Sequence, residues 1–296
     1  MTPITLRSGC KINLGLRIVG VRPDGMHLID SLFWPLAEPH DELILTPCDS
    51  ERIVVRCDAA IDPDHNTLTR AYARFKALVG DTPGVQIELV KGVPAGAGLG
   101  GGSADAATLL LWLNKGVTRP LSDAALTACA ASVGADVPFF LHACPSRVQG
   151  IGEVITPMPE LTPALAGWGL VLLCPGVHVS TPWAYGAWDT QRANTPENNL
   201  TSVDSKDRYL AFRTLAASLS RGRIDLENDL EAVVFKAHPE LEGFKASLIK
   251  QGAVHAAMSG SGSAIFGLFP PPDAARCHTL ARRWTEEGVR ALAQEL

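Results

Sequence analysis

An α+β fold is the class that this sequence predicts, and three stretches of the chain lead to it. The first sixty residues are rich in expected strands, with alternating apolar and polar residues at 10–20, a turn signal at 22–25 and an apolar return at 27–36. A glycine-rich loop at 92–102 then joins an expected strand to an alanine-rich helix. The C-terminal part reads helix, helix, strand, turn, strand, helix, which is typical of helices packed on an antiparallel sheet.

The other elements are expected from periodicity and from turn and cap residues. Strands are expected at 42–46, 52–57, 85–90, 147–155, 169–174, 254–259 and 264–269. Helices are expected from a cap at Asn66 to Val79, and at 103–114, 122–132, 208–220, 229–238, 241–251 and 273–288. A polar loop is expected at 194–207, and prolines at 157, 159 and 163 suggest a boundary near residue 160.

Composition and charge exclude several classes of protein. The chain has 296 residues, 46% of them hydrophobic and 19% charged, and a net charge of −5 with no basic run, so neither nucleic acid nor a membrane surface is expected as a partner. Seven cysteines form no C-x-x-C pair, and eight histidines form no H-E-x-x-H motif. We therefore expect reduced thiols, no metal held by protein side chains, a cytoplasmic location, and a monomer or weak homodimer.

The glycine-rich loop is expected to bind phosphate. Its glycines can adopt positive φ and turn several N–H groups toward an anion, and the helix that follows adds its unpaired first-turn donors. Ser103 stands where the glycines stop, so it either caps this helix or offers its hydroxyl to phosphate or metal. The alternative, a flexible loop without a ligand, is weaker because the glycines lead so directly into an apolar helix.

Two other kinds of phosphate loop fit the sequence less well. Gly96, Gly98 and Gly101 satisfy G-x-G-x-x-G, but the acidic residue about twenty positions on, Asp123, lies in an expected helix start instead of at a strand end. No Gly-Lys-Ser or Gly-Lys-Thr tripeptide occurs, which excludes a Walker loop.

Three short motifs elsewhere are weak signals when each is taken alone. Lys11 and Asn13 project from the same polar face of a strand, where they either meet a phosphate or hydroxyl or are simply solvated. Asp136, in the turn at 134–138, is either a rigidly held carboxylate or an ordinary turn residue. The SGSGS segment at 259–263 is either a tight hairpin turn or a second source of N–H donors.

Together these four segments, in this order, resemble the GHMP kinase superfamily of ATP-dependent small-molecule kinases. The resemblance spans nearly the whole chain and is most specific in CKINLGLRIVGVRPDGMH, VPAGAGLGGGSADAATLLLWLN, VGADVPFFL and MSGSGSAIFGLF. It points to the branch that phosphorylates the 2-hydroxyl of a cytidine-diphosphate-linked methylerythritol in isoprenoid precursor synthesis. It implies an N-terminal domain at 1–160 related to ribosomal protein S5 domain 2, a ferredoxin-like domain at 161–296, and an active site in the cleft between them.

The resemblance also implies roles for individual residues, with ATP and Mg²⁺ as cofactors. Asp136 would be the general base and Lys11 would stabilise charge on the reacting oxygen and the γ-phosphate. ATP would be bound by Lys91, Pro94, Gly96, Gly98, Leu99, Gly100, Gly101, Gly102 and Ser103. The substrate would be bound by Asn13, Met26, His27, Thr181 and Tyr185, with His27 reading the cytosine and Tyr185 stacking on it.

Two departures and two alternatives accompany this reading. Ala97 stands where the glycine loop of the family commonly has another glycine, and its neighbours keep the flexibility. The superfamily branch usually has Tyr where this chain has Met26, so one wall of the cytosine pocket would be a thioether, which can still pack on an aromatic face. The runner-up is a kinase of the homoserine or mevalonate type that acts on another alcohol. A non-catalytic nucleotide-binding protein of the same fold is less expected, because Lys11 and Asp136 are both present.

Overall fold

A computed structural model describes residues 2–49, 52–57, 62, 64–193 and 226–296. The chain forms two compact units that are discontinuous in sequence. The first unit contains residues 1–11, 35–95 and 100–143, and the second contains residues 12–34, 96–99 and 144–296. This division differs from a single boundary near residue 160, because the long strands β1 (Ile4–Val21) and β2 (His27–Cys48) each contribute residues to both units.

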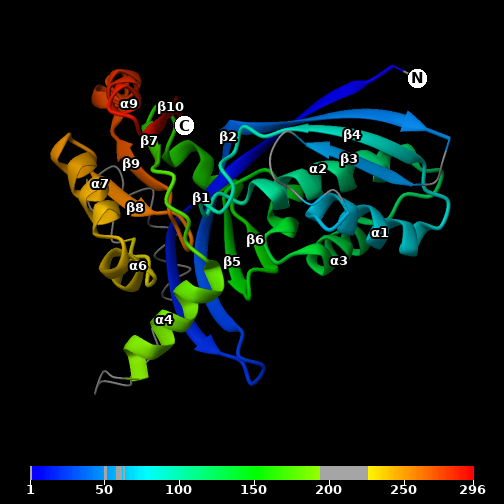
Figure 1. Cartoon of the computed structure of the whole chain (residues 1–296), viewed down its shortest axis with the longest axis horizontal. Helices are drawn as coiled ribbons and strands as arrows, with labels where there is room; N and C mark the ends of the chain where they lie inside the picture. Colours follow the sequence, from blue (N-terminus) through cyan, green and yellow to red (C-terminus); the bar gives the residue numbers. More distant parts are fainter. Residues whose placement is uncertain (1, 50–51, 58–61, 63, 194–225) are drawn as a thin grey trace. The chain divides into compact units, whose positions relative to one another are not determined.

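The first unit is a set of strands covered by helices. β3 (Ile53–Cys57) runs parallel to β4 (Gly84–Val90), and β4 pairs antiparallel with residues 42–48 of β2. Helices α1 (Thr67–Val79), α2 (Gly101–Gly116) and α3 (Asp123–Val133) lie on one face of these strands (Figure 1). Their apolar side chains form one core with the strands, and the short 3₁₀ helix η1 (Val137–Leu141) packs against α2 and α3.

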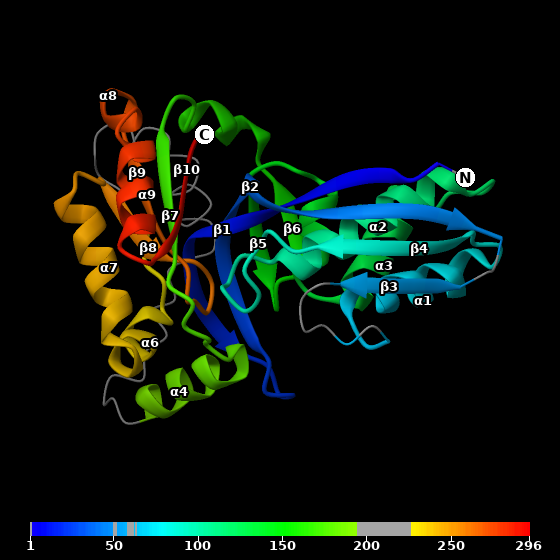
Figure 2. The same cartoon turned by 45° about the horizontal axis from the view of Figure 1, so that its top comes forward.

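The second unit contains a four-stranded antiparallel sheet, as the C-terminal sequence pattern predicts. Its order is β10 (Arg290–Glu295), β7 (Gly169–Cys174), β9 (Ile265–Phe269) and β8 (His255–Met258). Helix α7 (Pro239–Lys250) packs on β8 and β9, and α9 (Cys277–Glu286) packs on β7 and β10 (Figure 2). The remaining elements are β5 (Ser146–Gly150), β6 (Val154–Pro157), η2 (Pro159–Ala164), α4 (Thr181–Ala193), α6 (Glu231–Ala237) and α8 (Pro271–Ala274).

Most expected elements are confirmed, and the exceptions have tertiary causes. The strands expected at 27–36 and 42–46 are one strand, because β5 pairs with its first part and β4 with its last part. The strand expected at 147–155 is the hairpin β5–β6, and the helix expected at 273–288 is divided into α8 and α9. The expected loop at 194–207 and helix at 208–220 lie outside the described residues.

Besides the short 3₁₀ helices η1 and η2, one strand and one helix were not predicted. The alanine-containing C-terminus forms β10 because it completes an edge of the sheet against β7, and pairing of this kind overrides local propensity. Helix α4 itself contains Pro182 and the aromatic residues Trp183, Tyr185 and Trp188, and Ala184 is its only buried residue. Among the described residues, no helix combines the length and apolarity that crossing a membrane requires.

Helix α1 begins at a complete capping box. The Asn66 side chain accepts hydrogen bonds from the backbone N–H groups of Leu68 (2.9 Å) and Thr69 (3.0 Å), and the Thr69 hydroxyl accepts one from the Asn66 N–H (3.1 Å). These bonds satisfy donors that a helix start otherwise leaves without partners. The cap expected from the sequence at Asn66 is confirmed.

We predict that Asn66→Ala lowers the free energy of unfolding by about 1 kcal/mol, because the first-turn donors of α1 lose their acceptor. Asn66→Asp keeps an acceptor at the same place and should cost much less. Urea unfolding of the three proteins measures the difference. Equal destabilisation by both substitutions would mean that the cap does not stabilise α1.

Candidate active site

The glycine loop has the backbone geometry that a phosphate loop requires. Gly96, Gly98 and Gly100 have φ values of 67°, 76° and 73°, in the left-handed region that favours glycine. Gly100 is the N-cap of α2, whose first turn contains Gly101, Gly102 and Ser103. The expectation that Ser103 caps this helix is therefore wrong, and the hydroxyl is instead carried on the first turn of the helix.

Two of these glycines are also sites of close approach. A Cβ on Gly98 would overlap the backbone carbonyl oxygen of Ser259, within the second unit. A Cβ on Gly100 would lie 3.0 Å from Cζ of Phe140 and 3.4 Å from Cε of Lys11, within the first unit. Larger residues at either position would displace the loop. Of the other loop residues, Leu99 is buried and Pro94 is half-buried.

The turn between β8 and β9 holds the glycine loop by its carbonyl groups. The Ser259 hydroxyl donates to the Gly98 carbonyl (3.0 Å), and the Ala264 N–H donates to the Ala97 carbonyl (3.1 Å). Asn228 in turn donates from its side-chain amide to the carbonyls of Met258 and Gly260, both at 2.8 Å. The SGSGS segment is thus a hairpin turn with a second role, since it binds the loop that the sequence predicts to bind phosphate.

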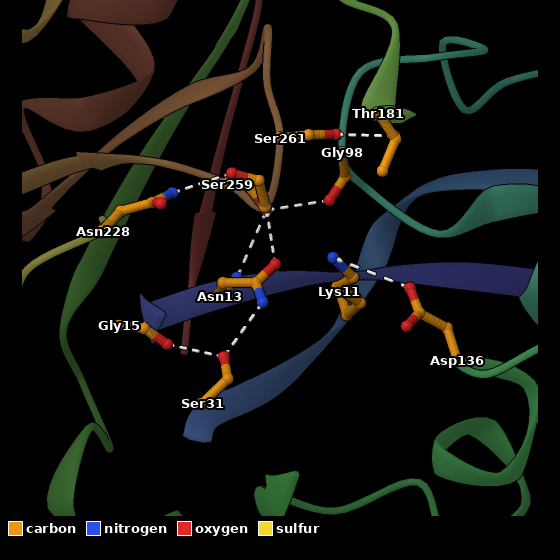
Figure 3. A network of polar contacts seen from close by, with 11 residues as sticks. Lys11, Asn13, Gly15, Ser31, Gly98, Asp136, Thr181, Asn228, Ser259 and Ser261 are labelled. Atoms are coloured by element: carbon orange, nitrogen blue, oxygen red, sulfur yellow. Dashed lines mark hydrogen bonds and ion pairs between the residues drawn. The ribbon is translucent and has the colours of Figure 1, made fainter. Parts of the chain in front are cut away.

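Asn13 is joined to the same turn (Figure 3). Its backbone N–H donates to the Ser259 hydroxyl (3.2 Å), and its side-chain amide donates to the Ser31 hydroxyl (3.0 Å). Ser31 itself donates to the Gly15 carbonyl at 2.5 Å. Asn13 is only 1% exposed, so the alternative of a solvated strand face is wrong at this position.

Lys11 and Asp136 come together in the first unit (Figure 3). The Lys11 ammonium nitrogen lies 4.0 Å from a carboxylate oxygen of Asp136, which stands at the N-cap of η1 without capping it through its side chain. The Lys11 side chain is 4% exposed and that of Asp136 is 32% exposed. Burial lowers the pKa of Lys11, and the Asp136 carboxylate opposes this shift. A buried cation thus faces an accessible carboxylate.

Lys91 lies in a buried ionic cluster within the first unit. Its ammonium group donates to Asp41 and, at 3.1 Å, to Asp105. Asp41 also accepts the backbone N–H groups of Gly92 and Val93, both at 2.7 Å, so it fixes the chain where the glycine loop begins. Burial acts to lower the pKa of Lys91, but the attraction of Asp105 and Asp41 outweighs it and the net shift is upward.

Asp105 is the member of this cluster whose charged form is disfavoured. Burial raises its pKa to about 7, although the Lys91 charge acts in the opposite direction. The neighbouring charge of Asp41 raises it further, because one lysine cannot fully compensate two buried carboxylates.

The remaining expected substrate residues lie in the second unit around α4. His27, at the start of β2, packs on Tyr185 with the ring centroids 4.7 Å apart and the planes inclined by 34°. Thr181, the first residue of α4, shares a hydrogen bond of 2.8 Å with the Ser261 hydroxyl of the β8–β9 turn. Met26 precedes His27 and is 47% exposed.

Residues 66–143 match the model of the GHMP kinases N terminal domain, and residues 208–287 match that of the GHMP kinases C terminal domain. The chain belongs to the GHMP kinase family. This confirms the resemblance seen in the sequence and, with the solved structures below, the two-domain GHMP kinase fold.

Two relatives of this chain carry the same name. The chain is 49% identical over 269 residues to the 4-diphosphocytidyl-2-C-methyl-D-erythritol kinase of Nitratidesulfovibrio vulgaris, with 90% of each chain covered. It is 42% identical to the kinase of that name from Lawsonia intracellularis, with 90% of this chain and 89% of the relative covered. A crystal structure of 4-(cytidine 5'-diphospho)-2C-methyl-D-erythritol kinase is similar with a TM-score of 0.76, 32% identity and 98% of each chain covered.

The fold extends beyond that group of kinases. A homoserine kinase structure from Cytophaga hutchinsonii has a TM-score of 0.73 at 19% identity, with 99% of this chain and 94% of that chain covered. At that identity the likeness concerns the fold alone.

Several residues of this GHMP kinase site were missed by sequence reasoning. Asp41, Trp188 and Asp189 stand alone in the sequence, and nothing in their spacing relates them to the motifs. Asp105 did leave a signal, because a carboxylate inside an alanine-rich helix needs a buried partner. Asn228 and Ser31 act through backbone carbonyls and hydroxyls, which no motif identifies.

We predict that Asp105 makes the stability of this GHMP kinase fall as pH rises from about 4 to about 7. The folded protein retains the Asp105 proton up to about pH 7, whereas the unfolded chain releases it near the ordinary value of 3.8. Stability is therefore lost as pH increases through that window.

Asp105→Asn removes the ionisation. The free energy of unfolding of the variant should therefore rise relative to that of the wild type as pH increases across this range. Urea unfolding at several pH values measures the gain, and Asp81→Asn, which changes an exposed carboxylate, is the control. A difference between Asp105→Asn and wild type that does not change with pH would contradict the raised pKa.

Proposed function

We propose that this protein transfers the γ-phosphoryl group of ATP to the 2-hydroxyl of 4-diphosphocytidyl-2-C-methyl-D-erythritol, in the synthesis of isoprenoid precursors by the non-mevalonate route. The observation that carries the proposal is the pairing of buried Lys11 with accessible Asp136 in a family of small-molecule kinases. The choice of alcohol is supported by relatives of that name that align over 90% of this chain.

The Lys11 and Asp136 groups suit the two demands of the reaction on the acceptor. A hydroxyl oxygen can make hydrogen bonds of about 2.8 Å to two groups whose polar atoms are 4.0 Å apart. Asp136 accepts the hydroxyl proton as the oxygen forms its bond to the γ-phosphorus and the bond to the ADP oxygen breaks. Lys11 stabilises the negative charge on the reacting oxygen and the transferred group, and burial makes this interaction stronger.

The glycine loop suits the triphosphate. Three positive-φ glycines precede the α2 N-terminus, whose unpaired N–H groups and dipole favour negative charge. Gly96, Gly98, Leu99, Gly100, Gly101, Gly102 and Ser103, with Pro94 before them, form this binding segment in our proposal. Mg²⁺ bound with ATP would supply further positive charge to the phosphates, and Ser103 would offer its hydroxyl from the first turn of α2.

The cytidine end of the substrate is assigned to the residues around α4. We propose that His27 and Tyr185 bind the cytosine, that Thr181 and Asn13 contact the rest of the substrate, and that Met26 lies beside the base. Stacking and edge hydrogen bonds suit a neutral pyrimidine better than charge does.

Lys91 is the proposed nucleotide contact with the least freedom. Its ammonium group has three donors, and two of them are directed at Asp41 and Asp105. One donor remains for the adenosine, and the same pairing lets Lys91 hold the start of the glycine loop through Asp41.

We predict that the purified protein, ATP, Mg²⁺ and 4-diphosphocytidyl-2-C-methyl-D-erythritol yield ADP and the 2-phosphate. Phosphorus NMR of the product identifies the phosphorylated hydroxyl, and homoserine and mevalonate are the comparison alcohols. Turnover of one of these without reaction of the cytidylyl substrate would replace the proposal by the other alcohol kinase function.

We predict that Asp136→Asn lowers kcat by about 10²- to 10⁴-fold while ATP affinity stays nearly constant, because the change removes a base without altering size. Lys11→Met should also lower kcat, and the double variant should be little worse than the poorer single variant, since both groups act on one oxygen. Steady-state kinetics and calorimetry with nucleotide test this. A kcat for Asp136→Asn above about half of the wild-type value would show that Asp136 is not the base.

A further inference from the structure

Three side chains from one face of helix α4 contact the imidazole of His27. Tyr185, Trp188 and Asp189 are spaced so that they share that face. Tyr185 packs on the imidazole at 4.7 Å, and Trp188 meets it edge-on with the centroids 5.8 Å apart and the planes at 83°. The imidazole Nε2 lies 2.8 Å from a carboxylate oxygen of Asp189. Although Asp189 is 48% exposed, the His27 side chain is only 10% exposed.

The backbone of His27 is fixed separately, by the turn before it. The Gly25 N–H donates to the Arg22 carbonyl (2.9 Å), the Arg22 N–H donates to the Met26 carbonyl (2.8 Å), and the Met26 N–H donates to the Asp24 carboxylate (3.2 Å). Arg22 and Asp24 also form an ion pair at 2.8 Å. The turn therefore fixes the backbone from which the imidazole projects, and α4 fixes the orientation of the imidazole.

The hydrogen bond to Asp189 decides which imidazole nitrogen carries the hydrogen. A carboxylate can only accept, so Nε2 must donate to it. In the neutral ring Nδ1 then has a lone pair and accepts. Among the described residues, no hydrogen-bond partner is found for Nδ1. A hydrogen-bond acceptor is thus left on the edge of the imidazole, in the group of residues to which we assign the cytosine.

An acceptor at that edge distinguishes two pyrimidines. Cytosine carries an amino group at position 4, which donates, whereas uracil carries a carbonyl oxygen there, which cannot donate to Nδ1. A uracil placed in the same way would bring two acceptors together and leave both without a hydrogen.

We propose that Asp189 is a positioning residue that keeps the hydrogen of His27 on Nε2, so that Nδ1 accepts from the amino group of cytosine and rejects uracil. The inference rests on the proposed function, because it concerns the cytidine end of that substrate. Asp189 acts only through His27. Trp188, which packs against the imidazole, is itself held by Arg192, whose guanidinium lies over the Trp188 ring at 5.2 Å.

The test compares 4-diphosphocytidyl-2-C-methyl-D-erythritol with its uridine counterpart as substrates. The wild-type protein should prefer the cytidine compound in kcat/KM by about 10- to 10²-fold, as expected when one acceptor is left without a donor. Asp189→Asn presents either an amide oxygen or an amide NH₂ to Nε2, so both hydrogen positions on His27 become available. We expect the preference to fall about tenfold, through a higher KM for the cytidine compound and a lower one for the uridine compound, with the ATP KM unchanged.

Three further variants separate this role from a structural one. Asp189→Glu retains a carboxylate and should restore most of the preference. Asp273→Asn changes another carboxylate near a helix start in the second unit, which pairs with Arg276 at 3.1 Å, and should leave the preference unchanged. In a His27→Ala background, Asp189→Asn should have no further effect on the preference, because its only route is through the imidazole.

The outcomes distinguish this inference from the proposed function. If the wild type does not phosphorylate the cytidine compound, the proposed function fails. If it does, the inference is overturned by a wild type that uses both compounds equally, by an Asp189→Asn protein with the wild-type preference, or by equal losses for the two compounds. Circular dichroism melts of each variant check folding, and an Asp189→Ser protein replaces Asp189→Asn if the latter does not fold.

Discussion

Hydrogen bonds that hold the backbone of the glycine loop in place are the constraint on which the proposed phosphate site depends. In the second unit, the Ser259 hydroxyl and the Ala264 N–H bind the carbonyls of Gly98 and Ala97. In the first unit, the Asp41 carboxylate binds the N–H groups of Gly92 and Val93, where the segment begins. Glycine supplies the conformations, and these neighbours reduce the freedom that glycine alone would leave.

Buried charge is used in two different ways in the first unit. Lys91 pairs with two buried carboxylates, Asp41 and Asp105, and through Asp41 it helps to hold the chain where the glycine loop begins. Lys11 is more deeply buried, with a side chain that is 4% exposed against 13% for Lys91, and its carboxylate neighbour Asp136 lies at 4.0 Å and is partly accessible. A buried cation beside an accessible carboxylate suits the phosphoryl transfer that we propose.

The residues that we propose to bind the substrate are held in place by neighbouring side chains. Asn13 has its amide held by Ser31 and its backbone N–H by Ser259. His27 has its ring held by Tyr185, Trp188 and Asp189 on one face of α4. Such neighbours reduce the number of orientations a binding group must give up when the substrate arrives, and this preorganisation favours both affinity and selectivity.

The sequence by itself determined the α+β class, the Asn66 cap and the order of the motifs, because periodicity, caps and glycine runs depend on neighbouring residues. It also pointed to Lys11, Asp136 and His27 as candidate site residues, through its resemblance to a family. Comparison with relatives shows that the chain belongs to that family. Only the tertiary structure decided that β2 is one strand, that β10 completes a sheet and that Gly100 instead of Ser103 caps α2. The partners of the site residues were likewise decided there. Asp41 lies 50 residues from Lys91, and Asp189 lies 162 residues from His27, and contacts over such separations leave no local pattern in the chain.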